Sequence, residues 1–171
     1  MANPTMTLIA SNTVGSGGLT YVTFSSIPQT YTDLLIKISA RTVATSSMPN
    51  IYMIFNSISS GYSTRYLMGT GSATSSATAG SASSIQVGVA DGSSQTANTF
   101  GNAELYIPNY TSANFKSVSS DSVAENNATA GNQNLTASLW SNTAAINTIL
   151  FFGDANFDQY STFYLYGISN S

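Results

Sequence analysis

The sequence predicts an all-β protein, a single-domain antiparallel β-sandwich that is jelly-roll-like. Three observations support this prediction. Apolar residues recur with a period of two in many short runs, which is typical of half-buried strands. Turn-forming Gly, Pro and Asn residues separate the runs, and no window of ten residues repeats apolar positions at helical spacing. A chain of 171 residues is long enough to bury one self-sufficient core.

Ten alternating runs are expected to form strands. The clearest one places Leu34, Ile36 and Ile38 on one face and Leu35 and Lys37 on the other. In chain order the ten runs are residues 5–10, 19–24, 33–41, 51–56, 64–68, 85–90, 98–107, 134–140, 146–152 and 161–168.

The chain divides into a short N-terminal part and one domain. Residues 1–18 are expected to form an N-terminal strand or arm and a Gly-rich turn, and residues 19–171 the β-sandwich. Within it, residues 69–84 contain only Gly, Ser, Thr and Ala, so they have nothing large to bury, and we expect a long surface loop. This loop is either a tolerated insertion or a contact for a partner surface.

The composition excludes most catalytic chemistry. The chain has eleven charged residues, no histidine and no cysteine, so it lacks the usual zinc ligands and the imidazole base of common nucleophilic triads. We therefore expect no enzymatic activity and no cofactor. The four cations are too scattered to bind nucleic acid, and they are Lys37, Arg41, Arg65 and Lys116. No signal peptide and no apolar run of membrane-spanning length is present, so we expect no membrane partner.

One segment imitates part of a calcium-binding loop. Asp154, Asn156 and Asp158 occupy alternate positions, as the first three ligands of such a loop do. Gln159 stands where the loop needs glycine, and Leu165 where it needs a bidentate glutamate. A structural turn is therefore favoured over a metal site.

The last strand and the single tryptophan supply the candidate interface residues. A period of two sends Phe163 and Leu165 toward the core, which leaves Tyr164, Tyr166 and Ile168 as an outward stripe suited to a subunit contact. Trp140 lies on the opposite strand face from Leu135, Ala137 and Leu139. It could anchor an interface or stack on a sugar from the solvent side, or it could cap the edge of the core.

Three strings resemble a group of tailed-bacteriophage virion proteins. They are FSSIPQTYTDLLIKISAR at 24–41, FNSISSGYSTRYL at 55–67 and YLYGI at 164–168. The group comprises small β-sandwiches that occur as capsid decoration (cement) proteins or as tail-fibre domains. The resemblance covers most of the chain, from residue 8 to 168, and it carries no catalytic residues.

The resemblance implies a structural protein of the virion, made in the host cytoplasm and then exposed on the particle. Because the chain has no heptad shaft or collagen-like stem, we expect a cement protein that binds the major capsid protein on the outside of the head. Low charge and surplus aromatic residues favour a homotrimer, since closed symmetry hides such surfaces. The alternative is a receptor-binding or carbohydrate-binding domain of a tail fibre.

Overall fold

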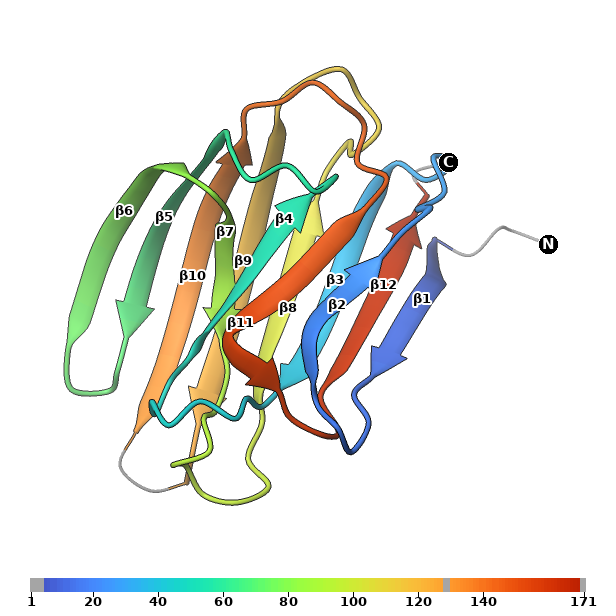
Figure 1. Cartoon of the computed structure of the whole chain (residues 1–171). Coiled ribbons are helices and arrows are strands. Elements are labelled where there is room, and N and C mark those ends of the chain that lie inside the picture. Colours follow the sequence, from blue (N-terminus) through green and yellow to red (C-terminus); the bar gives the residue numbers. More distant parts are fainter. Residues whose placement is uncertain (1–4, 128–129, 170–171) are drawn as a thin grey trace.

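The computed structural model describes residues 5–127 and 130–169, which form two antiparallel sheets packed face to face (Figure 1). The larger sheet has the strand order β1-β12-β3-β8-β9-β10-β5-β6, and the smaller has the order β2-β11-β4-β7. Within the described ranges there is no helix, hence none that could cross a membrane. The predicted all-β sandwich is confirmed. The strands are β1 Met6–Thr13, β2 Leu19–Phe24, β3 Asp33–Ala40, β4 Asn50–Phe55, β5 Tyr62–Gly69, β6 Thr74–Ala82, β7 Ile85–Val89, β8 Gly101–Ile107, β9 Lys116–Glu125, β10 Gly131–Trp140, β11 Ile149–Phe157 and β12 Thr162–Ile168.

Residues 5–18 form a strand and a turn, and the strand belongs to the sandwich itself. β1 is an edge strand of the larger sheet and pairs with β12 on both sides of a register shift between Leu8 and Ala10. The backbone N–H of Gly18 then donates to the Gly15 carbonyl oxygen at 3.0 Å, and Gly18 has a φ of +65°, which only glycine adopts easily. Residues 1–4, the start of the expected arm, lie outside the described residues.

The apolar core lies where β2, β11 and β4 cover β12, β3 and β8. The inward residues of β3 are the predicted ones, and each is buried. Phe163 from β12 contacts Phe151 and Phe157 from β11, with ring centroids 5.6 and 4.9 Å apart. Fully burying one such side chain contributes roughly 1.5–3 kcal/mol, so this aromatic group anchors one sheet on the other.

The two sheets approach more closely where β7 crosses β8, β9 and β10 (Figure 1). A Cβ atom added to Gly88 of β7 would lie 2.8 Å from the Ser122 Cβ and 3.3 Å from the Ala103 Cβ. Only small side chains fit this space, and the inward residues of β9 and β10 here include the hydroxyl-bearing Ser120, Ser122 and Thr136. Because β9 carries serine instead of large apolar residues on its buried face, its sequence does not mark it as a strand.

The expectation of a long loop at residues 69–84 is wrong for most of that range. Thr74–Ala82 forms β6, which pairs with β5 at the far edge of the larger sheet, and only residues 70–73 form the turn. The described side chains from Thr74 to Thr78 are exposed. Main-chain hydrogen bonds to β5 hold this strand, and such bonds leave no pattern in the side chains.

Trp140 is buried and cannot serve as an interface or sugar-stacking residue in the folded chain. Its side chain is 0% exposed, and its ring lies 5.3 Å from Phe55 and 6.1 Å from Tyr62. Trp140 does lie on the opposite face of β10 from Leu135, Ala137 and Leu139, as predicted. However, Leu135 and Leu139 occupy the solvent side, because the narrow space beneath β7 accepts only small residues until β10 reaches its end at Trp140.

Three charged side chains are buried close to loops, and two of them, Arg41 and Lys116, hold those loops by hydrogen bonds. The Arg41 guanidinium donates to the carbonyl oxygens of Gln95, Thr96 and Thr99 at 3.0–3.1 Å. The Lys116 ammonium donates to the carbonyl oxygens of Ser112 and Asn114, and burial lowers its pKa. The third charged residue, Asp91, is fully buried near Arg41.

The burial of Trp140 predicts a large loss of stability on truncation. We expect Trp140→Ala to lower the free energy of unfolding by about 3–5 kcal/mol, because it leaves a large cavity beside Phe55. Leu135→Ala, on the same strand but facing solvent, should change it by less than about 0.5 kcal/mol. Urea denaturation of both variants checks this. Equal losses in the two would contradict the assignment of the faces of β10.

Burial of Asp91 predicts a specific dependence of stability on pH. Burial raises the pKa of its carboxyl and the charge of Glu125 adds to this, whereas Arg41 and Thr99 oppose it. Between the ordinary and the raised pKa, the folded chain binds more protons than the unfolded chain, so this carboxyl destabilises the fold as pH rises through that window. This carboxyl should therefore lower the melting temperature as pH rises from 4 through that window. We expect Asp91→Asn to lack this decrease. Asp121→Asn, at an exposed position, should leave it in place.

Candidate functional site

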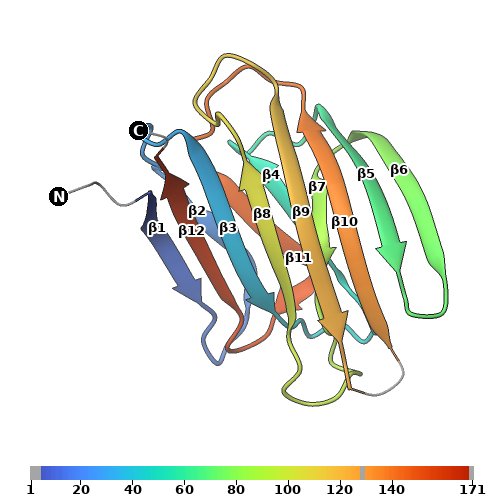
Figure 2. The ribbon, with the colours of Figure 1, turned by 180° about the vertical axis from the view of Figure 1, so that it is seen from behind.

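The candidate site is the outer face of the eight-stranded sheet, which is the face turned away from the smaller sheet (Figure 2). Strand register places its side chains in rows that cross the whole sheet. One row consists of Ser76, Leu67, Leu135, Asp121, Glu104, Lys37, Tyr164 and Ser11. The next row consists of Thr78, Arg65, Ala137, Ser119, Tyr106, Leu35, Tyr166 and Leu8.

The first part of this face is a tyrosine patch near β1 and β12. The patch comprises Met6, Leu8, Leu35, Tyr106, Tyr164, Tyr166 and Ile168. The rings of Tyr164 and Tyr166 lie 6.5 Å apart and nearly parallel, and both side chains are partly exposed. Phe163 and Leu165, between and beside them, are 0% exposed, so the predicted division of β12 into two faces is correct. The structure adds the neighbours that widen the predicted stripe.

The second part is a leucine patch on β5 and β10, which the sequence did not reveal. Leu67 and Leu135 lie directly opposite each other and are 54% and 50% exposed, and Leu139 lies further along β10. Their alternation with Asn134 and Thr136 is visible in the sequence, and apolar residues in such a pattern usually face the core. Here Asn134 and Thr136 face inward, on the same side of β10 as Ser138, whose hydroxyl shares a buried hydrogen bond of 2.9 Å with that of Thr64.

Charged residues separate the two apolar patches. The Lys37 ammonium donates to the Glu104 carboxylate at 2.6 Å, and this interaction raises the pKa of Lys37. Glu104 stands directly opposite Asp121 on β9, an arrangement of like charges that weakens a sheet. With Arg65, the centre of the face carries two cations and two anions, and Glu125, exposed at the end of β9 on the same face, adds one negative charge.

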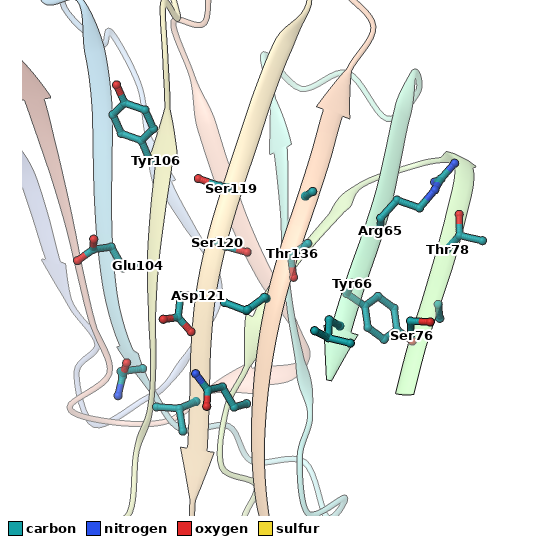
Figure 3. Close-up of a pocket in the computed structure, with 17 residues that line it drawn as sticks. Arg65, Tyr66, Ser76, Thr78, Glu104, Tyr106, Ser119, Ser120, Asp121 and Thr136 are labelled. Carbon is teal, nitrogen blue, oxygen red and sulfur yellow. The ribbon is translucent and has the colours of Figure 1, made fainter. Parts of the chain in front are cut away.

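A groove of about 1270 Å³ runs over β8, β9, β10, β5 and β6 on this face (Figure 3). Arg65, Leu67, Glu104, Asp121 and Leu135 line it, together with the amides of Asn102 and Gln133. A smaller hollow of about 620 Å³ continues along the same strands toward Pro108 and Leu139. The groove thus brings together residues from distant parts of the sequence.

The wall of the groove nearest β3 is fixed by a buried carboxylate. The Tyr106 hydroxyl donates to Asp33 Oδ2 at 2.7 Å, which raises the pKa of Tyr106. The other oxygen of Asp33 accepts from the backbone N–H of Asn109 at 2.8 Å. The Tyr106 ring is therefore held in place before any partner binds.

The segment that imitates a calcium loop has separate structural contacts. Asp154 Oδ2 accepts from the backbone N–H of Asn50 at 2.8 Å, and Asp158 Oδ1 from the backbone N–H of Gln159 at 2.8 Å. The carbonyl oxygen of Asn156 accepts from Val43 N at 3.0 Å. The contacts of Asp154 and Asn156 tie β11 to the start of β4 and to the chain before it, and that of Asp158 shapes the turn after β11. Among the described residues, no group of three His, Cys, Asp or Glu side chains is placed to hold a metal.

Comparisons of the chain with protein-family models, with curated proteins and with solved structures found no match. The chemistry of the outer face therefore carries the functional argument. This face has hydrogen-bonding groups and apolar side chains, which are the components of a binding surface.

The contacts of Asp154 and Asp158 predict that the fold does not depend on calcium. Because their oxygens already accept main-chain hydrogen bonds, we expect a chelator to change the melting temperature by less than about 1 °C. Differential scanning calorimetry with EDTA and with millimolar calcium checks this. A rise of about 3 °C or more with calcium, corresponding to roughly 1 kcal/mol for a chain of this size, would show a metal site.

Proposed function

We propose that this chain is a phage virion structural protein, a decoration (cement) protein that binds the outside of the head. In this proposal the outer face of the eight-stranded sheet contacts the major capsid protein and stabilises the contacts between its copies. The single observation that carries it is the exposure of two apolar patches on one face, around a centre with no net charge. The resemblance of three sequence strings to phage virion proteins supports the choice of partner.

The energetics of the outer face suit adhesion to a large surface. Fully burying an exposed leucine contributes roughly 1.5–3 kcal/mol, so covering Leu8, Leu67 and Leu135, each about half exposed, contributes roughly half of that per residue. Tyrosine side chains supply apolar area and a hydroxyl at low entropic cost, which is why they are common in interfaces. The paired charges at the centre contribute more to the orientation of the chain on its partner than to the affinity of binding.

Binding of this kind would strengthen a shell by mass action. A protein that binds only the assembled shell lowers the free energy of that state, by an amount that grows with its free concentration relative to Kd. The geometry of the shell would still be set by the capsid protein. The decoration protein would raise the resistance of the particle to heat and osmotic shock.

A second function, carbohydrate binding at a tail fibre, is favoured by the groove. Glu104, Asp121, Asn102 and Gln133 offer the carboxylate and amide groups that bind sugar hydroxyls, and Tyr106 offers a ring at the groove wall. Trp140, the other aromatic residue considered for this role, is buried and contributes nothing to it.

Deletion of the chain distinguishes the two functions. If it is a cement protein, virions that lack it should assemble and adsorb normally but lose infectivity faster on heating, because only the added shell contacts are missing. We expect purified protein to restore heat survival. Loss of adsorption with unchanged heat survival would instead support the tail-fibre function.

Matched variants locate the contact in the same assay. Leu67→Ser/Leu135→Ser should bind depleted virions at least tenfold more weakly, because it removes the centre of the leucine patch. Leu19→Ser, at an exposed position on β2 of the smaller sheet, should bind as the unmodified protein does. Equal binding by both would refute the outer face as the contact surface.

A further inference from the structure

We propose that β6 is a dimerisation edge, which pairs antiparallel with β6 of a second copy and joins two eight-stranded sheets into one. This inference does not rest on the proposed function. It starts from the place of β6 at the end of the larger sheet (Figure 2), where one side of the strand has no neighbouring strand.

Of the four edge strands, β6 has the longest regular edge. The pairing of β1 with β12 shifts between Leu8 and Ala10, and the pairings of β2 and β7 with their neighbours shift as well. The pairing of β6 with β5 also shifts, between Thr64 and Tyr62, but it keeps one register from Thr74 to Ala79, which is the longest unshifted stretch among the four edge strands. β6 also contains no charged residue and no proline, the residues that usually prevent an edge from pairing with another chain.

The exposed side chains of β6 do not explain why this segment forms a strand. From Thr74 to Thr78 both faces of the strand are exposed, so little apolar area is buried to offset the loss of conformational entropy. From Thr74 to Thr78, main-chain hydrogen bonds to β5 on one side hold the strand to the protein. A second strand on the other side would supply the matching set.

The hairpin turn identifies the main-chain groups that point away from β5. The backbone N–H of Thr70 donates to the Ala73 carbonyl oxygen at 3.0 Å. Hydrogen-bonded pairs alternate along an antiparallel ladder, so the next such pairs join Ser75 and Ala77 of β6 to β5. The N–H and C=O groups of Thr74, Ser76 and Thr78 therefore face outward.

One register of two β6 strands pairs all of these outward groups. A twofold axis beside Ser76 places Ser76 opposite Ser76 of the second copy, and Thr74 opposite Thr78 of the second copy. The side chains of these residues lie on the outer face, where the register with β5 sets them beside Gly69, Leu67 and Arg65. Cross-strand Ser and Thr pairs form hydrogen bonds, so the side chains in this register match as well.

Charge does not oppose this pairing. Arg65, directly opposite Thr78 on β5, is the charged residue next to the edge. In the proposed register the two copies of Arg65 are separated by three strand spacings of about 4.8 Å and four residue rises of about 3.3 Å. The resulting separation is about 20 Å, or roughly twice the Debye length in 0.1 M salt. A second copy of the chain is therefore a compatible partner.

The pairing closes at two copies, because each copy uses its only β6 edge. Light scattering of the purified chain should give twice 17.9 kDa at micromolar concentration. A monomer would overturn the proposal, and so would a trimer, which the composition of the chain led us to expect.

A proline at the centre of the edge tests the contact. Ser76→Pro removes an N–H that faces away from β5, a position at which strands tolerate proline. We expect a folded chain, checked by circular dichroism, with a dimer dissociation constant at least tenfold higher. Ser76→Ala keeps the N–H and should dimerise. A folded Ser76→Pro variant that remains dimeric would overturn the proposal.

A pair of double variants tests the register and does not depend on proline. Thr74→Lys/Thr78→Glu places opposite charges across the twofold axis, and Thr74→Glu/Thr78→Glu places like charges there. Both variants put the glutamate at 78 beside Arg65 of the same chain, so they are matched within each copy. We expect the first to be dimeric and the second monomeric in low salt. Equal dissociation constants would overturn the register.

Discussion

The close approach of β7 to the larger sheet determines how the rest of the protein meets water. Where Gly88 lies against Ser122, the space between the sheets admits only small side chains. β9 and β10 therefore turn serine, threonine and asparagine inward, and the leucines of β10 turn outward. The leucine patch is thus a consequence of packing on the opposite side of the same sheet.

The unequal size of the two sheets adds a second consequence. The smaller sheet has four strands and cannot cover all eight strands of the larger one (Figure 1). β6 lies beyond it as a two-sided, exposed edge strand. The outer face and this edge point in different directions, so one copy of the chain can use both at the same time.

The sequence predicts the fold well where side-chain size and strand pairing agree. In β3 and β12 large apolar residues fill one face, so a period of two identifies both the strand and its buried side. The same rule fails at β10, where the buried face carries Asn134 and Thr136. It also misses β6, because a strand held by main-chain hydrogen bonds needs no apolar pattern.

The groove could not be predicted from the sequence for a different reason. Its lining residues, such as Arg65, Glu104 and Asp121, come from strands that are distant in the chain and become neighbours only through the strand order. Tyr164 and Tyr166 were accessible to prediction because they share one strand. Periodicity within a strand carries no information on which strand lies beside it.

The near absence of charge on this protein has a consequence for the solutions in which it can adhere. Salt screens attraction between separated charges, and it affects main-chain hydrogen bonds and apolar contacts far less. On the outer face, the one ion pair among the described residues, between Lys37 and Glu104, lies within a single copy. Contacts made by its leucines, tyrosines and strand edges would therefore hold with similar strength in fresh water and in brine.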